Sequence, residues 1–306
     1  MARAVRFDEY GSVDVLRVED VADPSPEEGQ VVVAVVATSI NPGENSIREG
    51  LLDAVYPTSF PSGEGSDLAG RVIAVGPGVD RWQVGDEVLG WTDTRSAHAT
   101  LTTVPAGQLV AKPPSVSWEQ AGALFVAGVT AYAAVRAVGA GPDDTVAVSG
   151  AAGGVGSIAV QLLRAKGSRV LGIAGPSNHE WLTSLGVEPV TYGDGLEDRL
   201  RAVAPDGIDA FIDTFGSGYV ELAVGLGIDP QRIDTIIDFG AAEQFGVKAE
   251  GSATASTVEV VAELTDQLAS GAVTIPIAAT YPLEQVREAF TELAKRHTRG
   301  KIVLLP

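Results

Sequence analysis

The stretch that decides the fold runs from Thr145 to Leu163 and reads TVAVSGAAGGVGSIAVQLL. Its first residues, Thr145 to Val148, are typical of a short buried strand, and Ser157 to Leu163 have the apolar spacing of a helix. The residues between them are almost all small, which predicts a tight turn from strand to helix. On the template G-x-G-x-x-G the three positions are Ala151, Gly153 and Gly156, so alanine replaces the first glycine.

Small residues in such a turn have a chemical use. They let the backbone come close to a pyrophosphate, whose charge then meets free N–H groups and the positive end of the following helix. The turn therefore predicts a dinucleotide site. The alternative is that these glycines only allow the helix and the strand to pack closely.

The residues around this turn alternate between strand-like and helix-like segments. Helices are expected near Val155, Asn178, Leu196 and Tyr219. The expected strands are Thr145 to Ser149, Arg169 to Ala174, Pro189 to Thr191, Ala210 to Asp213 and Thr235 to Phe239. Short apolar strands that alternate with helices predict an α/β fold with a doubly wound, mainly parallel sheet.

The segments on either side of this region have a different pattern of expected strands and helices. The N-terminal third predicts short strands between Gly and Pro turns: Ala4 to Phe7, Leu16 to Val18, Val31 to Ile40, Arg71 to Val75 and Glu87 to Trp91. Further on we expect helices at Glu119 to Val138, Val258 to Ala269 and Leu283 to Lys295, and strands at Thr274 to Ala278 and Lys301 to Leu305. These segments predict a second, β-rich domain, and we expect the C-terminal tail to return to it.

Composition narrows the classes of function. The chain has 306 residues with 21 Lys plus Arg against 40 Asp plus Glu, a net charge of −19, which disfavours nucleic acid and anionic membrane surfaces as partners. It contains no cysteine, so disulfides and Cys-ligated metals are excluded. No signal peptide or stretch of about 18 apolar residues is evident, and a cytoplasmic location is the expectation.

The end of the second strand bears on the choice of cofactor. An acid usually follows this strand in NAD-binding folds, where it holds the ribose 2′-OH. Here no carboxylate follows Ala174 until Glu180, and Ser177, Asn178 and His179 offer donors to a 2′-phosphate. NADPH is therefore favoured over NADH. Ser177 or Asn178 could equally be an ordinary helix N-cap.

Six motifs in order resemble a known family. They are Ser39-Ile40-Asn41-Pro42, Gly65 to Gly70, Val75 to Val79, Val84 to Val88, Gly128 to Ala131 and Gly153 to Gly156. Over nearly the whole chain they resemble the quinone oxidoreductase (zeta-crystallin-like) branch of the medium-chain dehydrogenase/reductase superfamily. The resemblance implies a GroES-like catalytic domain at residues 1–118 and 263–306, and a Rossmann dinucleotide-binding domain at 119–262.

The resemblance also bears on metal binding. In zinc alcohol dehydrogenases of this superfamily a Cys and a His stand at the positions that look equivalent to Asn41 and Ser66. Neither residue can replace those ligands, so we expect no metal. Asp67 lies where the family has a Glu, and its simplest interpretation is structural turn chemistry. The three His residues, at 98, 179 and 297, are far apart in the chain.

The resemblance suggests cofactor-binding residues one by one. Asn41 and Thr130 would approach the nicotinamide, and Phe239 would position its amide. The remaining suggestions are Ala152, Gly153, Gly154 and Val155 at the pyrophosphate, Ser177 and Tyr192 by the 2′-phosphate, Ala174 as a further cofactor-binding residue, and Arg299 and Lys301 in the C-terminal motif beside the cofactor. Thr130 and Phe239 could instead be packed core, and Asn41 a turn residue before Pro42.

Two positions depart from the family pattern. A lysine that binds the 2′-phosphate in some relatives is Ser177 here, unless His179 or an arginine such as Arg199 takes its place. A tyrosine of the substrate pocket is Ser46 here, which predicts a larger or more polar pocket.

Without zinc, the best-supported chemistry is transfer of hydride from NADPH to a quinone or an α,β-unsaturated carbonyl. Asn41 and Ser46 are the candidate donors to the developing anion. No residue is required to be a general acid or base, since Glu44 is equally a structural partner of Asn41 and His98 is expected in solvent or on a β-turn. The alternatives are an enoyl-thioester reductase of a polyketide or lipid pathway and a non-catalytic NADPH-binding protein. A homodimer through a sheet edge near Val247 and Lys248 is also expected.

Overall fold

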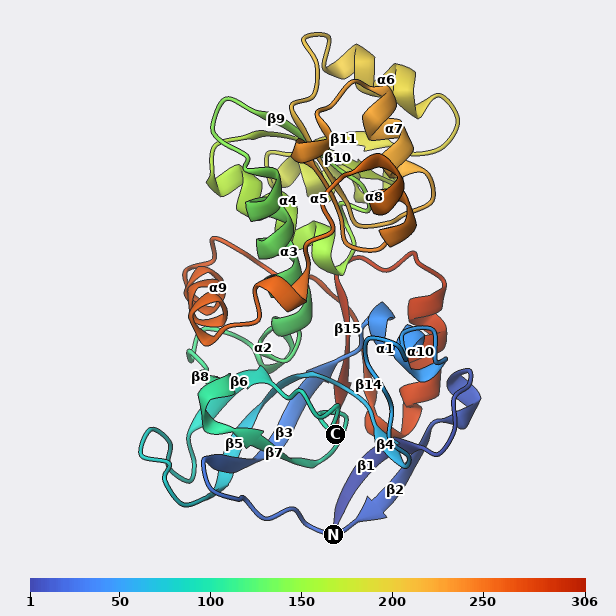
Figure 1. Cartoon of the computed structure of the whole chain (residues 1–306). Coiled ribbons are helices and arrows are strands. Elements are labelled where there is room, and N and C mark those ends of the chain that lie inside the picture. The colour runs from blue at the N-terminus through green and yellow to red at the C-terminus, as the bar shows by residue number, and fades with distance from the viewer. The chain divides into compact units, whose positions relative to one another are not determined.

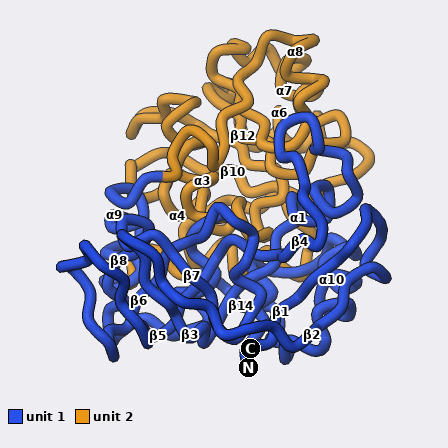
Figure 2. Tube along the Cα trace, turned by 60° about the horizontal axis from the view of Figure 1, so that its bottom comes forward, with its two compact units in different colours: residues 1–126, 257–270, 275–306 blue, residues 127–256, 271–274 orange.

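The computed structural model describes all residues, 1–306, which fold into two compact units (Figures 1 and 2). Unit 1 comprises Met1–Val126, Thr257–Ser270 and Ile275–Pro306, and unit 2 comprises Ala127–Ser256 and Gly271–Thr274. The domain borders expected from the sequence, at 118/119 and 262/263, stay predictions.

Unit 2 is built on a parallel sheet of five strands in the order β11-β10-β9-β12-β13. The strands are β9 (Thr145–Val148), β10 (Arg169–Ala174), β11 (Glu188–Thr191), β12 (Ala210–Asp213) and β13 (Ile233–Thr235). Ala147 in the central strand pairs with Leu171 on one side and with Phe211 on the other, and all three are fully buried. Apolar strands covered on both faces explain the doubly wound pattern of the sequence, and the predicted α/β class is confirmed.

Helices connect these strands. They are α4 (Gly154–Ala165), α5 (His179–Ser184), α6 (Leu196–Val203), α7 (Tyr219–Gly225) and α8 (Phe239–Phe245). The helix α4 buries every residue from Gly156 to Leu163, as its apolar spacing predicts. Lys248 pairs with Asp234 by an isolated parallel bridge and so extends the sheet by one residue beyond β13.

The predicted strand Thr235 to Phe239 is wrong. The strand β13 ends at Thr235, whose hydroxyl accepts the backbone N–H of Asp238 at 3.0 Å. The Asp238 carboxylate then accepts the N–H of Ala241 as the N-cap of α8. These side-chain acceptors draw the backbone into a turn and a helix, so Phe239 begins α8 instead of ending a strand.

Unit 1 contains two sheets. The smaller has the order β2-β1-β4, and the larger has the order β14-β15-β3-β5-β6-β8, with β7 also paired to β3. The strands are β1 (Ala2–Phe7), β2 (Arg17–Val21), β3 (Gln30–Ser39), β4 (Ser62–Gly63), β5 (Asp67–Val75), β6 (Glu87–Trp91), β7 (Leu101–Pro105), β8 (Leu109–Ala111), β14 (Ile277–Pro282) and β15 (Lys301–Leu305). The predicted β-rich texture of the N-terminal third is confirmed, while the strand expected at Thr274 to Ala278 is β14 and begins later.

The remaining helices are α1 (Pro42–Arg48), α2 (Trp118–Ala121), α3 (Phe125–Val138), α9 (Val258–Ser270) and α10 (Val286–Ala294). Short 3-10 helices are η1 (Val13–Val15), η2 (Ala106–Gln108), η3 (Pro176–Asn178), η4 (Pro230–Arg232), η5 (Ser252–Thr254) and η6 (Leu283–Gln285). The single helix predicted at Glu119 to Val138 is two helices, α2 and α3. Between them a Cβ on Gly122 would overlap the backbone carbonyl of Ala37, so the chain passes directly against β3 there.

The C-terminal strand β15 lies inside the larger sheet of unit 1. It pairs in parallel with β14 and antiparallel with β3, with Val303 opposite Ser39 and Leu304 opposite Thr38. This pairing brings Lys301, the first residue of β15, beside the segment that follows β3.

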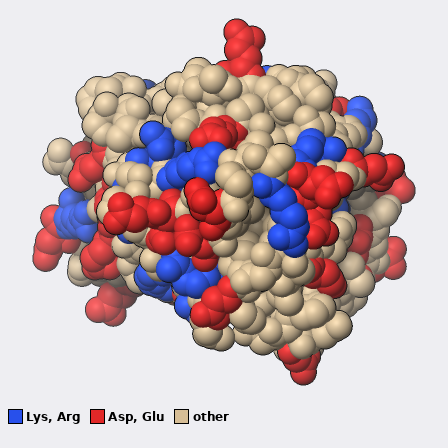
Figure 3. Space-filling view, turned by 90° about the horizontal axis from the view of Figure 1, so that it is seen from above, with Lys and Arg blue, Asp and Glu red and all other residues tan.

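The surface mixes the two signs of charge. On the face in Figure 3, basic side chains occur in small groups with acidic side chains beside them. None of the helices is long and apolar enough to span a membrane.

Candidate functional site

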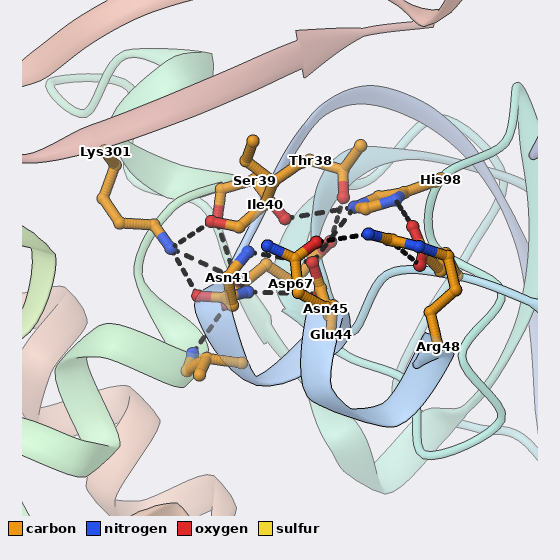
Figure 4. A network of polar contacts seen from close by, with 12 residues as sticks. Thr38, Ser39, Ile40, Asn41, Glu44, Asn45, Arg48, Asp67, His98 and Lys301 are labelled. Atoms are coloured by element: carbon orange, nitrogen blue, oxygen red, sulfur yellow. Dashed lines mark hydrogen bonds and ion pairs between the residues drawn. The ribbon is translucent and has the colours of Figure 1, made fainter. Parts of the chain in front are cut away.

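Unit 1 contains a buried polar cluster that the sequence did not reveal (Figure 4). We define it by eight residues, none of which is more than 6% exposed: Ser39, Asn41, Glu44, Arg48, Glu64, Asp67, His98 and Lys301. They come from the end of β3, from α1, from the start of β5 and β15, and from loops. Because buried charges are costly unless they are paired, their partners define the cluster.

Asn41 and Glu44 form the entrance to α1. Asn41 is the N-cap and Pro42 the first helical residue, an arrangement that suits proline because its missing N–H has no helical partner there. The Glu44 carboxylate accepts the backbone N–H of Asn41 at 2.8 Å and its side-chain Nδ2 at 3.2 Å. Glu44 is therefore a structural partner of Asn41. Burial is the main cause that raises the pKa of Glu44.

Asp67 is the hub of the cluster. Its fully buried carboxylate accepts the Ser39 hydroxyl at 2.6 Å, Asn41 Nδ2 at 2.8 Å and the N–H of Val126 at 2.7 Å. The expectation of turn chemistry at Asp67 is wrong. The residue begins β5, and its carboxylate connects three separate segments of unit 1.

Lys301 supplies the positive charge. Its Nζ donates to Asn41 Oδ1 and, at 3.0 Å, to the carbonyl of Ile40, and it lies 3.9 Å from Asp67 Oδ2. Burial lowers the pKa of Lys301, while the charges of Asp67 and Glu44 act in the opposite direction. An ammonium on one side and two carboxylates on the other fix the orientation of the Asn41 amide.

A second group of charges adjoins Glu44, which lies 4.0 Å from His98 Nε2. Arg48, which is fully buried, donates to Glu64 at 2.6 Å and lies over the ring of Phe290 at 4.7 Å. Burial raises the pKa of Glu64 to about 8 in spite of Arg48. His98 is 1% exposed, with Nε2 3.2 Å from the Ser39 carbonyl, so the expectation that it faces solvent is wrong.

Ser46, the other candidate donor, is half-buried on α1 and lies outside the hydrogen bonds of the cluster. Its carbonyl accepts the N–H of Leu51 at 2.9 Å.

In unit 2 the glycine turn has the geometry of a cradle. A Cβ on Gly156 would overlap the Gly150 carbonyl and lie 2.9 Å from Ala151 Cα, so only glycine fits. Gly153 is the N-cap of α4, and the first-turn N–H groups that follow it have no acceptor within the helix. Open donors beside a backbone without side chains fit a pyrophosphate.

The carboxyl ends of three strands of unit 2 are joined by Asp213, a second buried carboxylate. It accepts the Ser149 hydroxyl at 2.6 Å, the Thr235 hydroxyl at 2.8 Å and the N–H groups of Phe215 and Gly216 at 3.0 and 2.9 Å. No sequence motif predicted this residue. The available signal was a polar residue at each of three strand ends, where ligands bind in parallel sheets.

The end of β10 carries the residues expected at the 2′-phosphate. Ser177 is exposed, and Tyr192 is half exposed with its ring beside Gly175. Asn178 precedes α5 without a side-chain cap hydrogen bond, so N-capping does not explain it.

The two candidates to replace the missing lysine both have backbone partners. Arg199 donates to the carbonyls of Thr191 and Asp194 at 2.9 and 2.7 Å. His179 Nε2 lies 3.4 Å from the carbonyl of Ala174. Arg199 therefore binds the protein's own backbone, and its part in cofactor choice cannot be that of a free cation.

The other expected residues are divided between the units. Unit 2 holds Thr130, which is buried, and Phe239, which is 58% exposed, so the alternative of packed core is wrong for Phe239. Ala152 and Ala174 are buried in unit 2 as well. Arg299 is exposed in unit 1, just before β15.

Comparison with known proteins identifies the family. Residues 27–140 match the alcohol dehydrogenase GroES-like domain, and residues 185–304 match the zinc-binding dehydrogenase family. A quinone oxidoreductase from Pseudomonas aeruginosa is 31% identical over the full length of both chains. The chain belongs to the quinone oxidoreductase branch of the medium-chain dehydrogenase/reductase superfamily. It is accordingly an oxidoreductase of a family that binds nicotinamide cofactors, as the motifs predicted.

Two further relatives show the range of this family. The 2-methylene-furan-3-one reductase of Solanum lycopersicum is 31% identical, covering 99% of this chain and 79% of that protein. The quinone oxidoreductase of Escherichia coli, solved as a complex with NADPH, is 26% identical with a TM-score of 0.88, covering 99% of this chain and 100% of the other. The predicted Rossmann and GroES-like architecture is thereby confirmed.

Proposed function

We propose that this oxidoreductase is NADPH-dependent and zinc-independent and that it transfers hydride to a quinone or an α,β-unsaturated carbonyl compound. The observation that carries the proposal is the position of Lys301, whose ammonium group lies within the buried polar cluster beside Asn41 and Asp67.

The donor set of this cluster does not fit zinc. Zinc takes thiolate, imidazole or carboxylate ligands. The chain has no cysteine, and the histidine and carboxylates of the cluster do not converge in a group that could hold a metal ion. Both side-chain atoms of the Asn41 amide are already hydrogen-bonded, and both oxygens of Asp67 accept hydrogen bonds. A lysine ammonium 3.9 Å from Asp67 also repels a second cation. We therefore propose that the site works without a metal.

The glycine turn of unit 2 fits the cofactor. The first-turn N–H groups of α4 would bind the pyrophosphate, and the hydroxyls of Ser177 and Tyr192 would face the 2′-phosphate. A bound nicotinamide supplies the hydride. Both N–H groups of the Asn41 amide already donate to Glu44 and Asp67. Of the two candidate donors, the Ser46 hydroxyl would therefore donate to the oxygen of the electrophile, and Asn41 stays assigned to the nicotinamide.

The remaining proposed cofactor contacts follow the family pattern. We assign Thr130 and Phe239 to the nicotinamide, Ala174 to the cofactor site at the end of β10, and Arg299, just before β15, to the C-terminal motif beside the cofactor. The exposure of Phe239 supports its assignment, because an aromatic side chain left in solvent gains from covering a ligand.

The names of two relatives support the class of electrophile. One is a quinone oxidoreductase and the other a 2-methylene-furan-3-one reductase, and both names describe a conjugated carbonyl compound. Such electrophiles spread the negative charge that the hydride brings, so they need an oriented hydrogen-bond donor instead of a metal.

Oxidation of NADPH in the presence of quinones, alkenals and enoyl thioesters tests this proposal. Reduction of quinones or alkenals is expected. Faster reduction of enoyl thioesters would favour the alternative class of substrate, and reduction that zinc chelation abolishes would refute zinc independence.

The cofactor site has its own test. We expect Gly153→Val to abolish NADPH binding in calorimetry, because its side chain would occupy the cradle while the extended backbone at Gly153 accepts any residue. Gly225→Val, at a position with nothing within 4 Å of an added Cβ, is the matched control in the same unit. Unchanged affinity in Gly153→Val would overturn the assignment.

The quaternary structure and location are further proposals. We expect a homodimer in the cytoplasm, joined at the sheet edge near Val247 and Lys248. Light scattering that gives a mass near 31.5 kDa, the mass of one chain, would contradict the dimer.

A further inference from the structure

One side chain holds the loop 191–194 of unit 2. Arg199, in α6, donates from Nε to the carbonyl of Thr191 at 2.9 Å and from Nη1 to that of Asp194 at 2.7 Å. Its Nη2 donates to the carbonyls of Tyr192 and Gly193 at 3.3 and 3.1 Å. Four consecutive carbonyls thus converge on one guanidinium group.

These bonds leave Arg199 little capacity for a ligand. A guanidinium group has five N–H donors, and the loop takes four of them. The paired donors that bind a phosphate in a bidentate manner are therefore already in use. Arg199 shapes the loop, whose tight path also needs left-handed backbone at Gly193 and Gly195, with φ of +91° and +74°.

The loop in turn places Tyr192. A Cβ built on Gly175 would lie 3.4 Å from Tyr192 Cε1 and 3.5 Å from its hydroxyl oxygen. Gly175 follows the last residue of β10 and precedes the segment that holds Ser177. The phenol is 50% exposed, so its hydroxyl is held at the end of β10 and can still reach a ligand.

Resting on the proposed function, we propose that Arg199 determines the preference for a 2′-phosphorylated cofactor as a positioning residue: it fixes the loop 191–194 so that the Tyr192 hydroxyl donates to the 2′-phosphate. The charge of Arg199 is not itself the contact. This explains how a chain with Ser177 in place of the family lysine can still distinguish NADPH from NADH.

The ratio of the dissociation constants of NADH and NADPH, measured by calorimetry, tests this inference. We expect Tyr192→Phe to lower the ratio about tenfold, the value of one hydrogen bond to a charged group. Arg199→Gln and Arg199→Lys should lower it about as much, because neither side chain can bind four carbonyls. The double variant Tyr192→Phe with Arg199→Gln should lower it no further, since both changes remove the same contact.

Arg201 provides the matched control. It lies on the same helix and carries the same charge, but it bonds to Glu197 and to the carbonyl of Gly225. Arg201→Gln should leave the ratio unchanged. An equal loss in Arg201→Gln, or additive effects in the double variant, would overturn the inference and indicate a general effect of charge.

A second perturbation keeps the test valid if the Arg199 variants fail to fold. The backbone at Gly175, at φ −71° and ψ 155°, accepts valine. Its Cβ would already contact the Tyr192 ring at 3.4 Å, so we expect the methyl groups of Gly175→Val to push the ring aside without touching Arg199. It should lower the ratio as Tyr192→Phe does, and an unchanged ratio would refute the role of Tyr192. If the wild-type protein binds neither cofactor, the proposed function fails; if it binds NADPH and the ratio resists all these variants, only this inference fails.

Discussion

Asp67 and Asp213 are both completely buried carboxylates, but the two units solve the problem of the buried charge in different ways. Asp67 has three hydrogen-bond donors and a lysine ammonium 3.9 Å away. The hydrogen bonds to Asp213 come from two hydroxyls and two backbone N–H groups, all of them neutral.

The difference shows what each carboxylate does. Around Asp67 the charges are interdependent, so the removal of one strands the other in a medium where unpaired charge is costly. Around Asp213 the donors belong to strand ends and loops, and a neutral acceptor would serve most of them. The first carboxylate maintains an electrostatic balance, and the second organises the loops at the carboxyl edge of a parallel sheet.

Replacing each of the two aspartates, Asp67 and Asp213, by asparagine tests this difference most sharply. We expect the larger change in the free energy of unfolding at Asp67. We expect Asp67→Asn to lower the free energy of unfolding by about 3–5 kcal/mol, because Lys301 loses its countercharge and the new amide faces another donor, Asn41 Nδ2. Urea denaturation measures the change. Adding Lys301→Met should recover part of the loss, and a purely additive double variant would contradict the coupling.

A third buried carboxylate, Asp234 in unit 2, has a hydrogen-bond donor for only one of its two oxygens. Its Oδ1 accepts the N–H of Glu250 at 2.8 Å while its Oδ2 has no partner, and burial raises its pKa from 3.8 to about 7. Its contribution to stability is fully present below pH 3.8 and is lost as the pH rises through about 7. The expected decrease in the free energy of unfolding is about 2–4 kcal/mol.

Asp234→Asn should reduce the dependence of stability on pH by the share of Asp234, because the amide does not titrate and its carbonyl can still accept from Glu250. Thermal unfolding between pH 4 and 8 measures the slope. Asp198→Asn, at an exposed site on α6, should keep the wild-type slope. Glu64, whose pKa burial raises to about 8, keeps part of the slope in every variant, so an Asp234→Asn slope equal to that of the wild type would contradict the assignment to Asp234.

The smallest effect is expected at Asp213. In Asp213→Asn the remaining oxygen can accept from Ser149, Phe215 and Gly216, and the Thr235 hydroxyl can rotate to accept from the new amide. We expect a loss of only about 1 kcal/mol in the free energy of unfolding. A loss as large as that of Asp67→Asn, in the same urea experiment, would remove the distinction between the two carboxylates.

The sequence predicted helices and strands well where the local pattern of residues determines their ends. The strands β6, β10, β12 and β15 have the predicted bounds, because short apolar runs between Gly, Pro and polar residues leave little choice of where to end. The helix α1 was missed, although Asn41-Pro42-Gly43-Glu44 carries the signal of an N-cap followed three residues later by Glu.

The candidate site was predicted in part. A local pattern suffices for the glycine turn, since strand, turn and helix follow one another in the chain. The buried polar cluster was not predicted, because Asn41, Asp67 and Lys301 are brought together only by the pairing of β3 with β5 and β15. The hydrogen bonds of Arg199 were not predicted for a different reason. The sequence of a polar helix does not indicate whether a guanidinium group on it binds a ligand or the protein's own backbone.

The place of Lys301 in the chain has a consequence for synthesis. Unit 2 ends at Thr274, so all of its residues have left the ribosome before β15 does. Unit 1 begins first but acquires the strand between β14 and β3, and the ammonium beside Asp67, only from the last six residues, 301–306. The unit that is translated first is therefore the one that completes its fold last.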